Sequence, residues 1–160
     1  MATRKQAGSY VESSVRVLKG LEPVKERPGM YTLTCDPLHI IQEVVDNSSD
    51  EVLAGFGSKI EVWLHPDNSV TVEDNGRGIP VGMHPTEKQP VVQLVFTSLH
   101  AGGKFDNNAY KTSGGLHGVG SSVVNALSAH LEVNVYKNGQ IHHDAYERGI
   151  PTVELIDGLL

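Results

Sequence analysis

The sequence predicts an α+β fold, a two-layer sandwich in which a mixed, mostly antiparallel sheet carries helices on one face. Two hairpin patterns, over residues 59–74 and 131–147, supply the strands. Helical periodicity over residues 37–54, and again between the two hairpins, supplies the covering layer. The sequence contains no internal repeat, and its length of 160 residues suits one domain.

The composition is that of a soluble globular protein, with 39% apolar and 20% charged residues. There is no apolar run of 18 residues and no apolar leader, so we expect neither a membrane span nor a signal peptide. The single cysteine, Cys35, is more simply a passive thiol than a nucleophile, and it fits a reducing cytosol. The net charge of −6 disfavours direct binding of duplex DNA, which needs an excess of Lys and Arg. The eight histidines lack zinc-ligand spacing, and the adjacent His142 and His143 would point to opposite faces of a strand.

The N-terminal third is expected to contain an arm and one long helix. Residues 1–14 are polar and should form a flexible arm, whereas residues 15–31 carry spaced apolar side chains and end in a Pro-Gly turn. The helix is predicted from Pro37 to about Ala54, because Pro suits a first helical turn and Gly55 suits a C-terminal cap. Its buried face should carry Ile41, Val44, Val45, Ser48 and Val52.

The remaining elements follow in chain order. Alternating apolar residues from Ile60 to Leu64 predict a strand, and residues 70–72 continue a second strand after a Pro-Asp-Asn turn. A second hairpin is expected about the dipeptide Asn138-Gly139. The other expected elements are a helix over residues 91–103, an irregular loop over 101–120, a helix over 120–130 and a strand that begins within 152–156.

The predicted long helix carries a polar stripe beside its apolar face. Steps of four and three residues place Glu43, Asn47 and Asp50 on this stripe, with Glu51 next to them and His39 one turn earlier. A carboxylate such as Glu43 can polarise a water for attack, and the neutral oxygen of Asn47 suits a hard cation such as Mg²⁺. From this helix alone, a solvated polar face is the simpler interpretation.

Residues 72–80, VEDNGRGIP, place Asp74 at the end of a strand and before a Gly-x-Gly turn. A carboxylate there can accept a hydrogen bond from an exocyclic amino group such as that of adenine. Glycines would let the ring lie against the backbone. Taken alone, the stretch is more simply a plain turn.

Residues 111–122, KTSGGLHGVGSS, run into a predicted helix. Glycine N–H groups and a helix N-terminus together form an anion site suited to phosphate, and Lys104 and Lys111 can add cationic contacts. The stretch lacks the Gly-Lys-Ser/Thr ending of a P-loop and the preceding apolar strand of a Rossmann motif. Each piece taken separately also fits a flexible surface loop.

Together the three stretches resemble a known family. The order E-x-x-x-N-x-x-D-E, D-x-G-x-G, G-G-L-H-G-V-G resembles the Bergerat (GHKL) ATP-binding fold of gyrase-type topoisomerases, the large heat-shock chaperone, histidine kinases and mismatch-repair MutL proteins. Longer stretches, among them EVVDNSSDEVLAG and LHAGGKFDNNAYKTSGGLHGVGSSVVNALS, are similar to the B subunits of bacterial type IIA DNA topoisomerases over nearly the whole chain. The connection TLTCDPLH and the Asn-Ser within VVDNSSDE are more similar to topoisomerase IV (ParE) than to gyrase (GyrB).

The resemblance implies catalytic and metal-binding roles on the long helix. Glu43 would be the general base that activates water, and His39 would be hydrogen-bonded to it. Asn47 would be the Mg²⁺ ligand and would also touch phosphate.

The resemblance also implies an adenine pocket and a phosphate lid. Asp74 would accept the adenine amino group with Gly78 near the ring, and Arg77 and Glu51 would form an ion pair at the pocket mouth. The other implied ATP-binding residues are Tyr10, on an arm that reaches a partner subunit, Asp50, Pro80, Lys104, Tyr110, and a lid of Gly115, Leu116, His117, Gly118, Val119 and Gly120.

The implied cofactors are ATP and Mg²⁺, and ATP-competitive inhibitors are implied ligands. The implied partners are a second copy of the same subunit in an ATP-driven homodimer, the A subunit (ParC or GyrA) in an A2B2 heterotetramer, and duplex DNA bound by the full-length enzyme. Such a protein would act in the bacterial cytoplasm, associated with the chromosome and not with a membrane. Two alternatives stay open: a MutL- or chaperone-type GHKL module, and a nucleotide-binding module without turnover, which would not need Glu43.

The sequence departs from the family pattern at two places. Lys137 stands where gyrase B subunits often carry Arg, so the contacts of a planar guanidinium are not carried over. Residues 15–160 are expected to be a GHKL domain without its final Thr-Gly-Thr strand and without a transducer domain. We therefore expect a fragment of a longer subunit, which binds ATP and hydrolyses it slowly.

Overall fold

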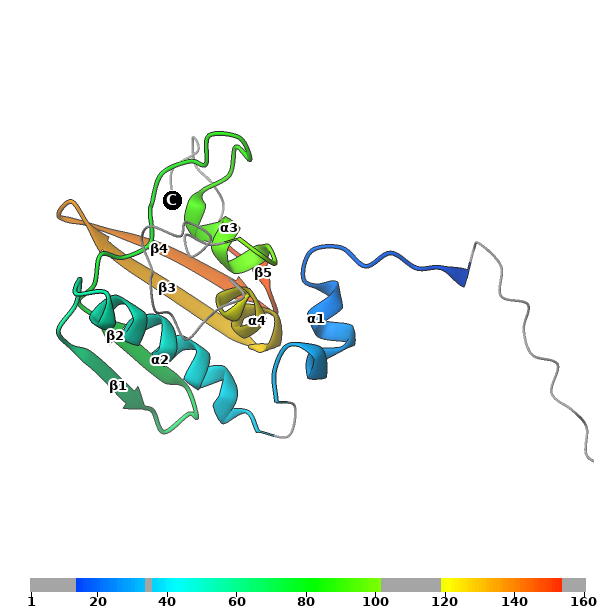
Figure 1. The fold of residues 1–160 in the computed structure, drawn as a ribbon, viewed down its shortest axis with the longest axis horizontal. Helices are drawn as coiled ribbons and strands as arrows, with labels where there is room; N and C mark the ends of the chain where they lie inside the picture. Colours follow the sequence, from blue (N-terminus) through cyan, green and yellow to red (C-terminus); the bar gives the residue numbers. More distant parts are fainter. Residues whose placement is uncertain (1–13, 34–35, 102–118, 154–160) are drawn as a thin grey trace, which may run out of the picture.

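The computed structural model describes residues 14–33, 36–101 and 119–153. Helices and hairpins alternate along this part of the chain (Figure 1). The elements are α1 (Glu22–Glu26), the 3₁₀ helix η2 (Pro28–Met30), α2 (Leu38–Leu53), β1 (Ile60–Leu64), β2 (Val70–Asp74), α3 (Val91–Thr97), α4 (Gly120–Leu127), β3 (His130–Lys137), β4 (Gln140–Glu147) and β5 (Ile150–Pro151).

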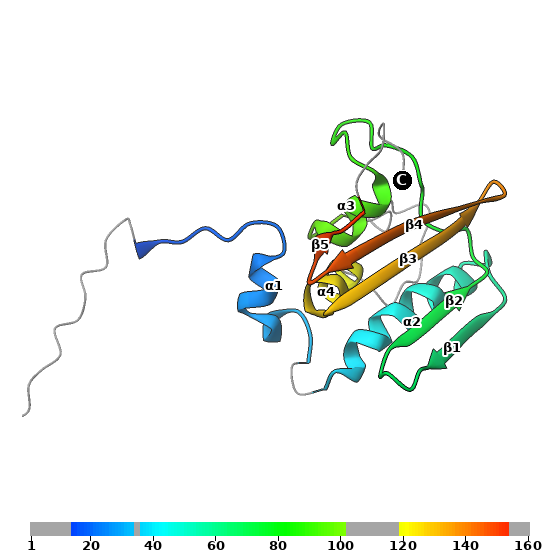
Figure 2. The same ribbon diagram turned by 180° about the vertical axis from the view of Figure 1, so that it is seen from behind.

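The described strands form two antiparallel sheets, β1-β2 and β3-β4-β5. In the first, Val62 lies opposite Val72. The second is built on a two-residue turn in which Asn138 and Gly139 have φ of 54° and 75°, the left-handed geometry that an Asn-Gly hairpin favours. Helices α3 and α4 lie on one face of β3 and β4 in both views, and α2 runs along the β1-β2 hairpin (Figures 1 and 2). The α+β class is confirmed; every strand pairing among the described residues is antiparallel.

Helix α2 agrees closely with its prediction, but its burial differs. It begins after Pro37, where the N–H of Leu38 donates to Asp36 Oδ1 at 2.9 Å, and it ends before Gly55, whose φ is 81°. The apolar residues expected on the buried face are only half-buried. The buried residues of α2 are Ser48 and Asp50. The inner face of this helix is therefore partly polar, which is unusual for a helix against a sheet and marks it as a candidate site.

The main apolar cluster lies between α1 and α4. Leu21, Val24, Val123 and Ala126 form it, with Tyr31, Leu99, Val119 and Leu127 packed around it. Sequence reasoning placed only a turn in residues 15–31 and missed α1 and η2, because helices of five and three residues show too little periodicity.

The last strand begins earlier than expected. The predicted strand began at Thr152, whereas Ile150 and Pro151 already pair with the end of β4 and Thr152 N–H donates to Ala145 O at 2.8 Å. Residues 154–156 lie outside the described residues.

A buried polar pair stabilises β4. Tyr146 is fully buried, and its hydroxyl donates to Asp144 Oδ2 at 2.6 Å. Burial, and then this hydrogen bond, raise the pKa of Tyr146 well above its usual range. The Tyr146 ring lies 5.7 Å from that of Phe96, centroid to centroid, so β4 is joined to α3.

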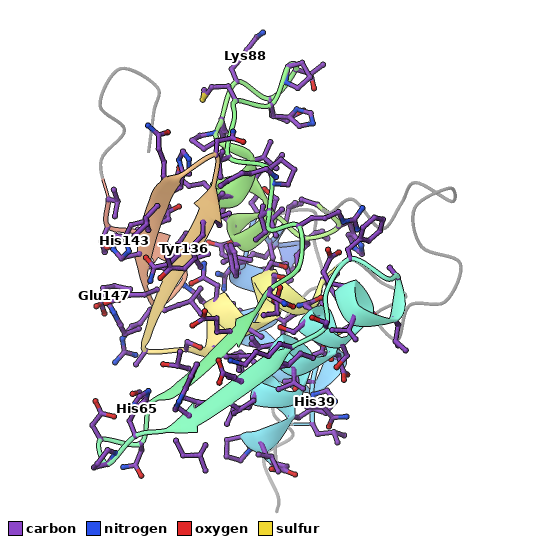
Figure 3. All side chains as sticks on the ribbon, turned by 90° about the vertical axis from the view of Figure 1, so that its left-hand side faces the viewer. His39, His65, Lys88, Tyr136, His143 and Glu147 are labelled. Carbon is purple, nitrogen blue, oxygen red and sulfur yellow. The ribbon has the colours of Figure 1, made fainter. Side chains whose placement is uncertain are left out.

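An exposed histidine joins β3 to β4. His130 Nδ1 lies 2.8 Å from Glu147 Oε1, and Nε2 lies 2.9 Å from Glu132 Oε1. Figure 3 shows Glu147 on this sheet. The hydrogen bond to Glu132, followed by that to Glu147, raises the pKa of His130, and the pKa of Glu132 is lowered by the bond to His130. The arrangement therefore requires a protonated imidazole between two carboxylates.

We expect His130→Gln to lower the melting temperature at about pH 6 and to leave it nearly unchanged above about pH 8.5. Because the folded-state pKa of His130 is raised, its contribution is present below the unfolded value of 6.5 and is lost as the pH rises through the folded value. Thermal unfolding followed by circular dichroism across this range measures the difference. His142→Gln is the control, since His142 lies opposite Val135 and on the other face of the strand from His143. A difference that does not shrink with rising pH would contradict this account.

Two kinds of feature are absent from the described part of the chain. Within the described ranges, no helix is both long and apolar enough to cross a membrane. Over the same ranges, no group of three or more His, Cys, Asp or Glu side chains is arranged to hold a metal ion.

Candidate nucleotide-binding site

The site is centred on α2, which contacts the end of β2 on one side and the start of α4 on the other. Ser48 of α2 bonds to Asp74 of β2, and Asn47 of α2 bonds to Ser121 of α4. The adjacent positions Asn47 and Ser48 therefore connect two chain segments that are far apart in the sequence. In Figure 3, His39 lies on α2, whereas the labelled His65, His143 and Glu147 lie on the β-hairpins.

Asp74 is held at both carboxylate oxygens. Oδ2 accepts a hydrogen bond from the buried hydroxyl of Ser48 at 2.9 Å, and Oδ1 accepts one from Gly76 N–H at 2.9 Å. Oδ1 of the next residue, Asn75, accepts hydrogen bonds from the N–H groups of Ser58 and Lys59. These bonds connect the turn to the segment just before β1. The Asp74 residue remains exposed, so a fixed acceptor faces solvent at the end of a strand.

Glycine is required at position 76, which sequence reasoning did not assign. A Cβ atom there would lie 2.8 Å from Asp74 Oδ1 and 2.9 Å from Glu51 Cβ. Gly78 was assigned, and its φ of 68° and a 3.0 Å approach of its would-be Cβ to Val135 Cγ1 also favour glycine. The Gly-x-Gly spacing was the signal that could have identified Gly76.

Arg77 and Glu51 form the ion pair that the resemblance implied. The guanidinium donates through Nε at 3.0 Å and through Nη2 at 2.8 Å, a bidentate contact that fixes its plane. Phe56 lies below it, 3.5 Å from the ring centroid to Cζ. Lys137 Nζ donates to the Arg77 carbonyl at 3.3 Å. Phe56 was missed because nothing in its local sequence indicates a partner 21 positions away.

The other half of the site is the start of α4. Asn47 Nδ2 donates to Ser121 Oγ at 3.4 Å, and a Cβ atom on Gly120 would lie 2.5 Å from Glu43 Oε2. The Glu43 carboxylate thus lies against the first turn of α4. That turn presents N–H groups that have no partner within the helix, as at every helix N-terminus, and such groups attract anions. The glycine at 120 makes room for Glu43.

The surroundings of two predicted site residues, His39 and Asp50, differ from those expected. His39 Nδ1 lies 2.7 Å from Thr32 Oγ1, and the expected hydrogen bond to Glu43 is not formed in this structure. Asp50 is only 3% exposed, and its place among the ATP-binding residues stays a prediction. Helical periodicity alone does not show how far a polar residue is buried.

The structure brings together Glu43, Asn47, Glu51, Asp74, Arg77, Gly78 and Gly120, with Pro80 following the Gly-x-Gly turn and Val119 capping α4. The remaining predicted residues, which are Tyr10, Lys104, Tyr110, Gly115, Leu116, His117 and Gly118, lie outside the described residues.

The chain is similar to curated proteins of two kinds. It is 54% identical over 153 residues to the B subunit of DNA topoisomerase 4 from Francisella tularensis, covering 94% of this chain and 24% of that protein. It is 58% identical over 152 residues to the B subunit of DNA gyrase from Thermotoga maritima, covering 92% of this chain and 24% of that protein. The chain therefore spans about a quarter of the length of these relatives, and the identities do not separate the two kinds.

Solved structures show the same fold. The topoisomerase IV ATP-binding domain of Francisella tularensis, in complex with a small-molecule inhibitor, matches with a TM-score of 0.72 and 49% identity over 88% of this chain and 64% of that one. The 43K ATPase domain of Thermus thermophilus gyrase B, in complex with an aminocoumarin, matches with a TM-score of 0.69 and 43% identity over 82% of this chain and 32% of that one. The GHKL fold expected from the three motifs is confirmed.

A family model supplies the broader assignment. The model described as "Histidine kinase-, DNA gyrase B-, and HSP90-like ATPase" matches residues 36–150, which include α2, both hairpins and the start of β5. The match covers well over half of the 160 residues. The chain belongs to the family of histidine kinase-, DNA gyrase B- and HSP90-like ATPases.

Proposed function

We propose that this chain is the ATP-binding and ATP-hydrolysing domain of a type IIA DNA topoisomerase B subunit. The observation that carries the proposal is the chain of contacts from Asp74 through Ser48 and Asn47 to Ser121. It joins an acceptor suited to a purine amino group to a helix N-terminus suited to phosphate. The curated relatives named as topoisomerase 4 and gyrase B subunits support the same assignment.

Each residue of the site has one proposed task. Asp74 accepts the 6-amino group of adenine, and Gly78 lets the ring lie near the backbone. Glu43 acts as general base on the attacking water, beside the start of α4 where the phosphates bind. Gly120 and the predicted segment 115–119 supply backbone N–H groups to the phosphates.

Asn47 of α2, beside the start of α4, fits a ligand of a magnesium ion. Asn47 offers an amide oxygen, a ligand type that Mg²⁺ accepts in combination with phosphate oxygens and waters. Asn47 adjoins both Ser121 and the helix turn proposed for phosphate. When bound, Mg²⁺ would neutralise charge that develops on the phosphate oxygens.

The proposal extends to partners. We propose an ATP-driven homodimer, an A subunit (ParC or GyrA) in an A2B2 assembly, DNA bound by the whole enzyme, and action in the bacterial cytoplasm. The net charge of −6 supports DNA contact through other parts of such an assembly. The solvent-facing Arg77–Glu51 pair at the site is a contact for ATP-competitive inhibitors, in keeping with the inhibitor complexes of the two similar structures. Topoisomerase IV stays favoured over gyrase on the sequence features given above.

Titration calorimetry tests the proposal. A non-hydrolysable ATP analogue is expected to bind one site per chain, and more tightly when Mg²⁺ is present. The same titration with a GTP analogue should show at least about tenfold weaker binding, because guanine presents a carbonyl to Asp74. Absence of binding, or equal affinity for the two nucleotides, would contradict the proposed function.

Ser48→Ala is expected to weaken ATP-analogue binding about three- to tenfold. The hydroxyl orients Asp74 without touching the base, so its loss frees one carboxylate oxygen to rotate. Calorimetry on Ser48→Ala and on Ser49→Ala, a neighbouring serine for which no contact with Asp74 is found, measures the effect. Equal losses in the two variants would show that Ser48 has no orienting role.

A further inference from the structure

Asn125 is a fully buried amide in the middle of α4. Its Nδ2 donates to the carbonyl oxygen of Phe96 at 2.9 Å, while its Oδ1 has no hydrogen-bond partner among the described residues. Burying an unpaired polar oxygen is costly, and an apolar residue of similar size would avoid that cost. The amide of Asn125 is therefore explained by the hydrogen bond that its Nδ2 donates to Phe96.

The acceptor lies at the end of α3. The Phe96 carbonyl is one of the last four of that helix, which have no partner inside it. Neighbouring carbonyls are satisfied locally, since Leu94 O accepts from Ser98 N–H and Gln93 O accepts from the Thr97 hydroxyl. Asn125 thus supplies from α4 a cap that α3 does not supply for itself. The Phe96 ring, packed on Tyr146, joins the same point to β4.

The turn of α4 that precedes Asn125 faces the proposed catalytic helix. Ser121, four residues earlier, accepts the hydrogen bond from Asn47, and Gly120 lies against Glu43. Helix α4 is therefore held at its first turn by α2 and one turn later by α3. A shift of α4 along α3 would move its N–H groups relative to Glu43 and Asn47.

We infer that Asn125 is a positioning residue. It fixes the position of the N-terminal turn of α4 relative to α2, and so it determines how tightly the site binds the phosphates. This inference rests on the proposed function. The adenine end is held separately, by the Ser48–Asp74 hydrogen bond between α2 and β2. Loss of the Asn125 donor should therefore weaken recognition of the triphosphate and leave recognition of adenosine unchanged.

Binding of two ligands separates these effects. Dissociation constants for adenosine and for a magnesium-bound non-hydrolysable ATP analogue are measured by NMR titration on the wild type, Asn125→Leu and Val123→Ala. For Asn125→Leu we expect about tenfold weaker binding of the analogue and less than about twofold weaker binding of adenosine. Val123→Ala is the matched control, since it removes buried volume from the same helix on the side that packs against Leu21 and Val24. The control should give no difference between the two ligands.

The outcomes are distinguishable from failure of the proposed function. If the wild type binds neither ligand, the proposed function itself fails. If the wild type binds both and Asn125→Leu weakens both equally, or if Val123→Ala shows the same selective loss, Asn125 is merely structural and the inference is overturned. Should Asn125→Leu lack a cooperative thermal transition, Asn125→Ser replaces it, because a serine hydroxyl is too short to reach the Phe96 carbonyl and the same selective loss is expected.

Discussion

Asp74→Ala is expected to weaken binding of an ATP analogue by about a hundredfold or more. The substitution removes a charged acceptor that is already oriented by Ser48 and Gly76, so the adenine amino group loses a charge-assisted hydrogen bond. The loss should be largest for adenine nucleotides and small for a purine nucleotide that lacks the 6-amino group. Calorimetric titration with both nucleotides measures it.

The neighbouring Glu73 offers the control for this variant. Glu73 is exposed on β2 opposite Glu61, and strand geometry directs it away from the face that carries Asp74. Glu73→Ala removes the same charge from the same strand, so it should bind both nucleotides as the wild type does. If Glu73→Ala and Asp74→Ala lost affinity equally, a general loss of negative charge or of folding would explain the result, and Asp74 would have no place in the pocket.

Glu43→Gln is expected to bind the ATP analogue as tightly as the wild type and to slow hydrolysis of bound ATP at least about a hundredfold. Gln preserves the size of the side chain beside Gly120 but cannot take a proton from water. Single-turnover measurements with protein in excess over ATP report the chemical step alone, so they do not depend on the rate of product release. Affinity is measured in parallel by calorimetry.

Gln42→Ala is the control for the base, because Gln42 is an exposed neighbour on the same helix. It should leave both affinity and rate near the wild-type values. A parallel fall of affinity and rate in Glu43→Gln would show that Glu43 serves binding rather than proton transfer. An unchanged hydrolysis rate in Glu43→Gln would show that another residue is the general base and that Glu43 only packs against α4.

The parts of the fold that could be predicted from the sequence are those specified locally. Helix α2 carries 16 residues of clear periodicity between a proline and a glycine, and Asn138-Gly139 requires positive φ at both positions of a two-residue turn. These signals depend on neighbours within a few positions. Both elements formed where they were expected, within one or two residues.

The parts that could not be predicted depend on distant partners. Ser48 and Asp74 are 26 positions apart, and only the folded chain shows that Ser48 orients the carboxylate. Glu51 and Arg77 are equally far apart, and their ion pair was expected only from the family resemblance. The part of the constraint on Gly76 that comes from Glu51 could not be predicted, because Glu51 lies on another element, whereas Asp74 is only two positions away. The contact of His39 with Thr32 could not be predicted for the same reason, since Thr32 comes from the segment before α2. Burial of Asp50 likewise depends on tertiary packing and not on helical phase.

The most direct test of the central claim is a crystal structure of this chain with magnesium and a non-hydrolysable ATP analogue. The claim is that α2 joins an adenine acceptor on β2 to a phosphate site at the start of α4. We expect the 6-amino group within hydrogen-bond distance of Asp74, the phosphates at the first turn of α4, and Mg²⁺ on Asn47. A nucleotide bound elsewhere, or one whose base lies away from Asp74 while its phosphates avoid α4, would contradict it.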